Sequence, residues 1–201
     1  MESLFWFAVF GSLFSYFIYP FTLVLLKKFY PSPLNTSQPT SSTITPSVTF
    51  VITAHNEAKQ IKEKLDNTLE LDRSSLEVQI IVASDFSTDG TDEIVESYAS
   101  QGVELVRADQ HLGKEYAQLC GIRASKGDII IFSDSATRLQ PSALKTLVPY
   151  FDDPAIGALS SEDRFLSADG KVAGEGAYVK YEMWLRKLES NCAGLVGLSG
   201  S

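Results

Sequence analysis

The chain is 201 residues long, and its composition already excludes several classes of protein. With 44% hydrophobic and 11% aromatic residues it can bury a sizeable core, which excludes an intrinsically disordered protein. The 25 acidic residues outnumber the 17 basic ones and give a formal net charge of −8. Because neutralising phosphates requires clustered lysine and arginine, we expect no nucleic-acid partner.

The cysteines, Cys120 and Cys192, stand far apart in the sequence. Neither belongs to a CxxC motif or to a Cys/His spacing typical of zinc sites. We therefore expect neither a disulfide framework nor a zinc centre, and a reducing compartment is the simpler interpretation.

The first predicted element is a transmembrane helix within residues 1–30. Residues 3–26 contain no charged side chain and are rich in Phe, Leu, Val and Tyr. At about 1.5 Å per residue the helix would be roughly 36 Å long, enough to cross a bilayer. Pro20 and Gly11 are both tolerated in membrane helices. A secretory signal peptide is the alternative, but it would begin with basic residues and have a shorter apolar run.

Lys27 and Lys28 follow this apolar run directly. By the positive-inside rule, they keep the C-terminal end of the helix in the cytoplasm. We therefore expect a single-pass membrane protein whose C-terminal domain is cytoplasmic. Residues 31–46 are almost entirely Pro, Ser, Thr, Asn and Gln, which predicts an extended linker.

Residues 47–201 alternate short β-branched runs with longer stretches of helical periodicity. This alternation predicts an α/β fold with a layered, mostly parallel sheet and right-handed crossovers. The predicted strands are residues 48–53, 78–83, 103–106, 128–132 and 156–160. The predicted helices are residues 57–71, 91–99, 114–125, a segment after Pro141, and 175–190.

Polar and acidic residues follow three of the predicted strands. In parallel sheets, ligands bind outside the carboxyl ends of the strands. A carboxylate there can accept a hydrogen bond from a base or ribose, or hold a divalent cation against phosphates. Turn formation and helix capping are the alternative for each cluster taken singly. The three clusters, which together favour a site, are residues 54–57, 84–91 and 133–137.

The segment His111-Leu112-Gly113-Lys114 precedes a predicted helix. Backbone N–H groups and the lysine ammonium could both meet a diphosphate at such a position. The segment is not a Walker A loop, and the chain has no GxGxxG motif, which disfavours a dinucleotide oxidoreductase. His55 lies beside a strand end without a recognisable nucleophile, so we assign it a structural role.

Four sequence motifs occur in a specific order. They are residues 51–57 (VITAHNE), 81–91 (IVASDFSTDGT), 113–114 (GK) and 126–134 (KGDIIIFSD). In this order and spacing, they resemble the family-2 glycosyltransferases, especially the membrane-anchored branch that makes polysaccharides. The resemblance covers roughly residues 47–200, and it implies the GT-A fold, a Rossmann-like fold of nucleotide-diphospho-sugar transferases.

The resemblance also implies an activity: transfer of a sugar from a UDP-sugar-like donor to an acceptor hydroxyl in polysaccharide or glycan synthesis. It places Asp85 against a uracil-type base. It gives Asp134 the role of holding Mg²⁺ or Mn²⁺ on the donor diphosphate. The implied partners are the nucleotide-sugar donor, a glycan or lipid-linked acceptor, and the membrane. The implied nucleotide-sugar-binding residues are Ala54, Asn56, Glu57, Asp85, Lys114 and Asp134.

The chain departs from the family pattern at several places. Asp134-Ser135-Ala136 keeps only the first carboxylate of the usual Asp-x-Asp, and Leu119 replaces an Asn. The family's catalytic base lies in a later Glu-Asp pair, so we expect the base beyond Ser201, with Glu162 and Asp163 as lesser candidates. The chain thus resembles the first part of a longer enzyme. A non-catalytic nucleotide-binding fragment is the alternative, whereas a nucleotidyltransferase is disfavoured because no Gly-rich loop follows the first strand.

The predicted helix at residues 175–190 carries aromatic and apolar side chains near one side. We interpret them as a stripe facing the core or the membrane. Stacking on an acceptor sugar is the alternative. The residues are Tyr178, Tyr181, Met183, Trp184, Leu185 and Leu188.

Overall fold

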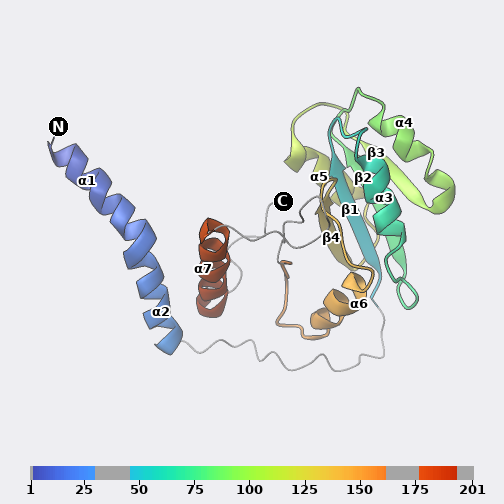
Figure 1. Ribbon diagram of the computed structural model, residues 1–201. Helices are drawn as coiled ribbons and strands as arrows, with labels where there is room; N and C mark the ends of the chain where they lie inside the picture. Colours follow the sequence, from blue (N-terminus) through green and yellow to red (C-terminus); the bar gives the residue numbers. More distant parts are fainter. Residues whose placement is uncertain (1, 30–45, 162–176, 194–201) are drawn as a thin grey trace. The chain divides into compact units, whose positions relative to one another are not determined.

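The computed structural model describes residues 2–29, 46–161 and 177–193 (Figure 1). The chain divides into two compact units. One contains the N-terminal helices and α7, and the other spans residues 39–156. Most of the predicted linker, residues 31–46, lies outside the described residues.

A four-stranded sheet of parallel strands, in the order β3-β2-β1-β4, forms the centre of the second unit. In register, Ala54 lies beside Ser84, and Thr53 lies beside Asp134. The carboxyl ends of β1, β2 and β4 therefore meet at one edge. The strands are β1 (Val48–Ala54), β2 (Val78–Ser84), β3 (Val103–Arg107) and β4 (Ile129–Asp134).

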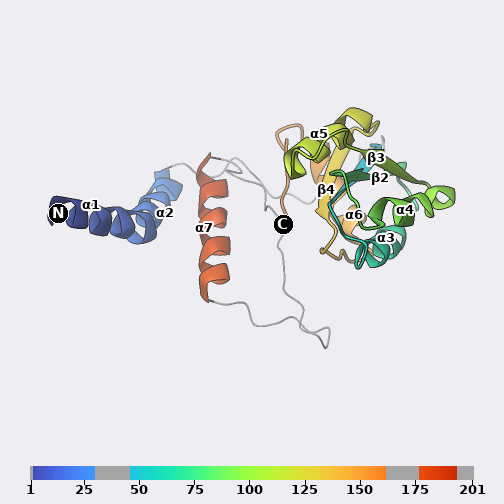
Figure 2. The same ribbon diagram turned by 90° about the horizontal axis from the view of Figure 1, so that it is seen from above.

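Helices cover both faces of this sheet (Figure 2). On one face, Phe50 and Ile52 of β1 belong to a core cluster with Ile61 and Leu65 of α3. On the other face, Ala117 of α5 packs on β1 and β2. Because both faces are covered, β1 is buried along its whole length, as expected for the central strand of a parallel sheet. The helical elements are α3 (Ile61–Leu69), α4 (Thr91–Glu96), η2 (Ala99–Gln101), α5 (Lys114–Ala124), α6 (Ala143–Leu147) and η3 (Val148–Asp152).

Four of the predicted strands are confirmed, and the α/β fold with a parallel sheet is confirmed with them. The fifth prediction, a strand at residues 156–160, is wrong. The backbone N–H of Ile156 donates to the carbonyl of Asp153 at 2.9 Å, which closes a turn instead of pairing with a strand. With Gly157 inside a run of only a few apolar residues, this segment has too little apolar surface to form a buried strand.

A continuous helical run from Glu2 to Phe29 forms the N-terminal part of the first unit. It consists of α1 (Glu2–Leu13), the π-helical turn η1 (Phe14–Ile18) and α2 (Tyr19–Phe29). By length and composition, this run could cross a membrane. Most of its large apolar side chains are exposed in the protein, including Phe7 at 77%.

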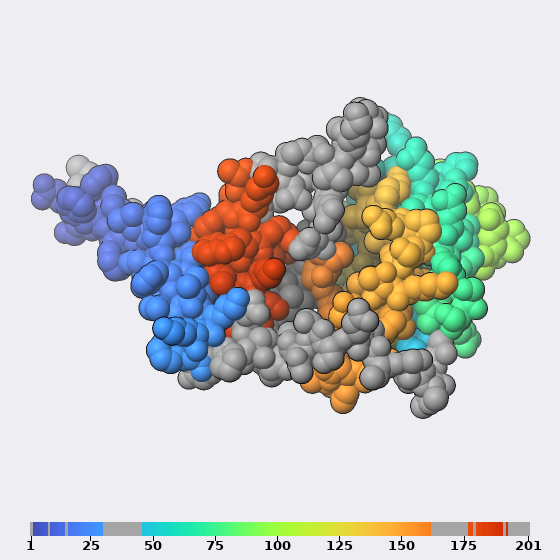
Figure 3. All heavy atoms as spheres, turned by 60° about the horizontal axis from the view of Figure 1, so that its bottom comes forward, coloured from blue at the N-terminus to red at the C-terminus, as the bar shows by residue number. Residues whose placement is uncertain are grey.

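Helix α7 (Ala177–Ala193) packs against this run in the same unit, as Figure 3 shows. Pro20 has no N–H to donate to the carbonyl of Tyr16, four residues earlier. The Tyr181 hydroxyl of α7 donates to that carbonyl at 3.1 Å. The Tyr19 hydroxyl donates to the Glu189 carboxylate at 2.7 Å. Part of the predicted aromatic stripe of α7 therefore faces the N-terminal helix.

Candidate functional site

A pocket of about 250 Å³ opens at the carboxyl ends of β1, β2 and β4. The chain leaves β1 toward β2 on one side, whereas β4 lies on the other side of β1. The gap between β1 and β4 is thus the topological switch point, where open parallel sheets bind their ligands. The pocket is lined by Thr53, Ala54, His55, Glu57, Asp85, Lys114, Asp134, Ser135 and Ala136.

Most of the nucleotide-binding residues expected from the resemblance lie in this lining. They come from three strand ends and the start of α5, and they are Ala54, Glu57, Asp85, Lys114 and Asp134. Asn56 is not part of the lining. Its side-chain oxygen accepts the Thr88 N–H at 2.9 Å, and its left-handed backbone (φ 55°) is a conformation that Asn tolerates better than most residues.

Asp85 directly follows β2, and its buried side chain contacts the loop between β3 and α5 (residues 108–113, the α5 loop). One carboxylate oxygen accepts the Gly113 N–H at 3.3 Å, and the other lies 2.8 Å from His111 Nδ1. Gly113 has φ 95°, a conformation that favours glycine. The Gly-Lys motif therefore brings a backbone N–H to Asp85 and places Lys114 at the first position of α5.

Asp134 is the last residue of β4 and forms an ion pair with Lys114. The Lys114 Nζ lies 2.8 Å from one carboxylate oxygen and 3.0 Å from the other. The next residue, Ser135, is buried and also lines the pocket, and Ala136 contributes no polar side-chain group to the lining. One carboxylate with hydroxyl neighbours suits Mg²⁺ or Mn²⁺, since these ions take oxygen ligands and often use only one or two protein carboxylates besides phosphates.

Thr53 adds a polar group that sequence reasoning missed. Thr53 lines the pocket, and its hydroxyl is buried without a hydrogen-bond partner among the described residues. A buried hydroxyl without a partner costs about 1–3 kcal/mol. A ligand in this pocket that hydrogen-bonds to Thr53 would recover that energy. Strand alternation could not reveal this, because Thr is common in strands for packing reasons alone.

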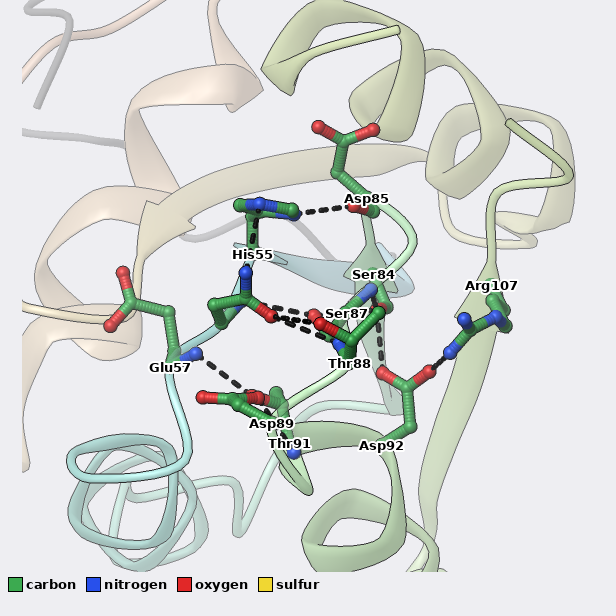
Figure 4. A network of polar contacts seen from close by, with 11 residues as sticks. His55, Glu57, Ser84, Asp85, Ser87, Thr88, Asp89, Thr91, Asp92 and Arg107 are labelled. Carbon is green, nitrogen blue, oxygen red and sulfur yellow. Dashed lines mark hydrogen bonds and ion pairs between the residues drawn. The ribbon is translucent and has the colours of Figure 1, made fainter. Parts of the chain in front are cut away.

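The turn after β2 is bonded to the segment after β1, as Figure 4 shows. The Thr91 hydroxyl accepts the Glu57 N–H at 2.8 Å and donates to Asp89 at 2.5 Å. Burial acts to raise the pKa of Asp89, but hydrogen bonds from the Thr91 hydroxyl and from the N–H groups of Ala58 and Thr91 hold it below its usual value. Asp89 and Thr91 thus form the turn before α4, which was the alternative interpretation of this cluster, whereas Asp85 lines the pocket.

A second set of contacts fixes the backbone next to Asp85 (Figure 4). Arg107 of β3 pairs with Asp92, which also accepts the Ser84 hydroxyl at 2.5 Å. The Arg107 guanidinium lies 4.6 Å from the centroid of the Phe86 ring. Phe86 has φ 56°, which costs a non-glycine residue about 1–3 kcal/mol. These contacts hold the strained residue in place and so fix the exit of β2.

Lys64 of α3 supports the end of β4 from beneath. Its side chain is fully buried, and its ammonium donates to Ser133 Oγ at 2.6 Å and to the Thr137 carbonyl at 2.9 Å. Burial lowers the pKa of Lys64 to about 8; the charge of Arg138 acts in the same direction and that of Asp134 opposes it. Lys64 therefore holds the turn that carries Asp134.

Of the two histidines, His55 lines this pocket and His111 lies next to His55 outside the lining. We expected His55 to be structural, and its Nδ1 does lie 2.6 Å from the Asp85 carbonyl oxygen, but its ring also lines the pocket. His111 stacks on it, with ring centroids 4.3 Å apart. The only sequence signal for His111 was its place before the Gly-Lys motif. The lesser base candidates, Glu162 and Asp163, lie outside the described residues.

Residues 49–187 match the Glycosyl transferase family 2 domain, and the chain belongs to this family. The fold agrees. The mannosyltransferase PcManGT from Pyrobaculum calidifontis, solved in complex with GDP-Man and Mn²⁺, aligns with a TM-score of 0.67 and 26% identity. The alignment covers 90% of this chain and 50% of that one.

Similar proteins are named for glycan synthesis. The succinoglycan biosynthesis protein ExoO of Rhizobium meliloti (strain 1021) is 30% identical over 128 residues, which are 63% of this chain and 36% of that protein. An N-acetylglucosaminyltransferase of Mesorhizobium japonicum is 29% identical over 167 residues, 80% of this chain and 37% of that protein. The chain thus spans little more than a third of the length of these relatives.

Proposed function

We propose that this chain is the donor-binding part of a glycosyltransferase that transfers a sugar from a UDP-sugar-like donor to an acceptor hydroxyl in polysaccharide or glycan synthesis. The observation that carries the proposal is one pocket at the switch point of a family-2 domain, lined by both Asp85 and Asp134. The names of its relatives, a succinoglycan biosynthesis protein and an N-acetylglucosaminyltransferase, support a glycan acceptor.

In this proposal, different pocket residues bind the base and the diphosphate of the donor. Asp85, buried at the end of β2, accepts a hydrogen bond from the base and replaces its contact with His111 to do so. Thr53 offers its unpartnered hydroxyl to the nucleotide. Lys114 lies beside Asp134 and brings a positive charge to the donor diphosphate.

Asp134, with the Ser135 hydroxyl nearby, would hold the divalent cation. The cation would neutralise negative charge that develops on the departing diphosphate. The structurally similar mannosyltransferase PcManGT, which was solved with GDP-Man and Mn²⁺, supports a divalent metal in this family, and we propose Mg²⁺ or Mn²⁺ here. Because Ala136 supplies no second carboxylate, we expect the cation to bind weakly without nucleotide.

The acceptor side is proposed from chemistry alone. Inverting transfer needs a general base within hydrogen-bond reach of the acceptor hydroxyl. Asp85 and Asp134 serve the donor in this scheme, so the base is expected beyond Ser201, with Glu162 and Asp163 as lesser candidates. A nucleotide-binding part without catalysis of its own is the second candidate function, and Ala136 in place of a carboxylate favours it.

We also propose that the run from Glu2 to Phe29 anchors the protein in a membrane and leaves the α/β unit in the cytoplasm. Its length and apolar composition, and the two lysines at its C-terminal end, support this orientation. Nucleotide sugars and an oxygen-ligand metal site are compatible with that compartment.

Calorimetric titration of UDP into the full chain tests the donor site. We expect binding that strengthens with Mg²⁺ or Mn²⁺, and loss of this metal dependence in Asp134→Asn. Asp85→Ala should weaken binding even at saturating metal, because a lost hydrogen bond to a charged group costs about 1.5–3 kcal/mol, or roughly ten- to hundredfold.

The matched control is Glu96→Gln, which removes an exposed carboxylate on α4 outside the pocket lining. It should bind UDP like the wild type. Equal affinity in wild type, Asp85→Ala and Asp134→Asn would contradict the site. UDP binding of the expected kind without sugar transfer would favour the non-catalytic candidate.

A further inference from the structure

His55, Asp85 and His111 form a compact cluster at the base end of the pocket. They are the two histidines of the whole sequence and the buried carboxylate between their segments. The imidazole rings stack with centroids 4.3 Å apart and planes 17° from parallel. One possible ligand atom from each of the three residues lies within 4.8 Å of the other two. The proposed donor binding uses Asp85 but neither of the two histidines.

The hydrogen bonds of the cluster define its protonation pattern. His55 Nδ1 lies 2.6 Å from the carbonyl oxygen of Asp85, which can only accept, so Nδ1 carries the proton. The other nitrogen, Nε2, accepts from the Asn56 side-chain amide at 3.1 Å and so bears the lone pair. A histidine that donates one N–H to a backbone carbonyl and presents the other nitrogen is oriented as metal-binding histidines are.

His111 is held in a similar way. Its Nδ1 lies 2.8 Å from the Asp85 carboxylate oxygen, a separation close to that of neighbouring ligand atoms around an ion with bonds of about 2.0–2.2 Å. An ion that takes the place of this shared proton needs only a change of tautomer at His111. Asp85 is buried, whereas both histidines are exposed, so small side-chain shifts that keep the His55 bond to the Asp85 carbonyl can close the remaining gap. At His55 Nε2 the ion would replace the Asn56 amide.

We propose that His55, Asp85 and His111 bind one divalent transition-metal ion, such as Zn²⁺, Co²⁺ or Ni²⁺. Two imidazoles and one carboxylate favour these ions over Mg²⁺ or Ca²⁺, which take oxygen ligands. The site is distinct in chemistry from the oxygen ligands around Asp134. The absence of a cysteine motif, which argued against a zinc centre in the sequence, does not bear on it.

A titration of the full chain with Co²⁺, followed by visible absorption and calorimetry, tests the site. The chain carries no polyhistidine tag and is kept in excess Mg²⁺ to occupy oxygen sites. Because the sequence contains two histidines, any histidine-dependent signal comes from this cluster. We expect His55→Gln and His111→Gln each to weaken Co²⁺ binding at least tenfold, since even outer partners of a ligand are worth about 10- to 100-fold.

Two control variants distinguish this cluster from carboxylates and thiols elsewhere in the chain. Glu96→Gln and Cys120→Ser should keep the Co²⁺ affinity of the wild type. Both histidines are exposed, so their variants should remain folded, which circular dichroism verifies. No uptake of Co²⁺ by the wild type, or equal uptake by the histidine variants, would overturn the proposal.

One consequence rests on the proposed function. If Asp85 serves both the base and the metal ion, then UDP and Co²⁺ must compete, and a Co²⁺, Zn²⁺ or Ni²⁺ ion bound by the histidines opposes donor binding. Raising UDP should therefore lower the apparent Co²⁺ affinity. Independent binding of the two would contradict the shared use of Asp85. Histidine-dependent Co²⁺ binding in a chain that never binds UDP would contradict the proposed function and leave the metal site standing.

Discussion

Lys64 hydrogen-bonds to the C-terminal end of β4 and to the turn that follows it. A buried ammonium loses its hydration, and that loss is reflected in the lowering of its pKa to about 8. Its hydrogen bonds to Ser133 and Thr137 offset part of this cost. The position of the Asp134 turn thus depends on a group whose charge is itself destabilising.

This gives a pH-dependent prediction for Lys64→Met. Between about pH 8 and 10.5 the unfolded chain keeps a proton on Lys64 that the folded chain has lost, so wild-type stability rises with pH in this window. Over this pH window, the free energy of unfolding of the wild type should rise by up to about 3 kcal/mol relative to that of Lys64→Met. Urea unfolding at pH 7 and pH 10 measures the free energy of unfolding of both proteins.

Lys62→Met is the control. Lys62 is exposed and its hydrogen bond with Asp66 raises its pKa, so we expect no such rise in the stability of the wild type relative to Lys62→Met. If the wild type gained the same stability with pH relative to both variants, burial of Lys64 would not be the cause of the effect.

At the level of single residues, sequence reasoning indicated which acidic residues line the pocket but not which side chains they contact. Asp85 and Asp134 could be expected at the pocket because each ends a β-branched run, and strand ends of a parallel sheet meet. The ion pair of Asp134 with Lys114 and the stacking of His55 on His111 could not. Both depend on how the α5 loop returns to the sheet, which local periodicity does not determine.

Helix α5 depends on close contact with the sheet. A Cβ atom at Gly121 would lie 2.7 Å from Val51 Cγ1 and 3.3 Å from Ala83 Cβ. We therefore expect Gly121→Val to destabilise the fold by about 1–3 kcal/mol through overpacking. Thermal or urea unfolding measures the change. Leu119→Val, which places the same side chain at an exposed position of the same helix, should cost less than about 1 kcal/mol. Equal effects would show that α5 does not lie close to the sheet.

Among the elements, the bounds of β1 and β2 were predicted more closely than those of α3. β1 and β2 are buried runs of β-branched residues, so one pattern sufficed. The predicted helix at 57–71 is shorter in the structure, because residues 57–60 form the turn that binds the loop after β2. That turn depends on Thr91, 34 positions away from Glu57, and no local pattern reveals it.

For the whole molecule, the proposed orientation predicts the fate of a fused reporter. A reporter placed after Ser201 that needs an oxidising compartment should stay inactive, since in the proposed orientation Lys27 and Lys28 keep that side of the helix in the cytoplasm. Moving both lysines ahead of Ser3 should weaken or reverse the preference. A cytoplasm-dependent reporter at the same position is the control. Strong activity of the first reporter in the unaltered chain would refute the orientation.

We propose above all that the pocket lined by Asp85 and Asp134 binds the nucleotide-sugar donor. A crystal structure of the protein with UDP and Mn²⁺, with the metal located by its anomalous signal, tests it most directly. We predict the Mn²⁺ peak beside the Asp134 carboxylate and the uracil edge against Asp85, with Thr53 within hydrogen-bond reach of the nucleotide. A nucleotide bound away from the carboxyl ends of β1 and β4, or an Mn²⁺ peak remote from Asp134, would contradict this assignment.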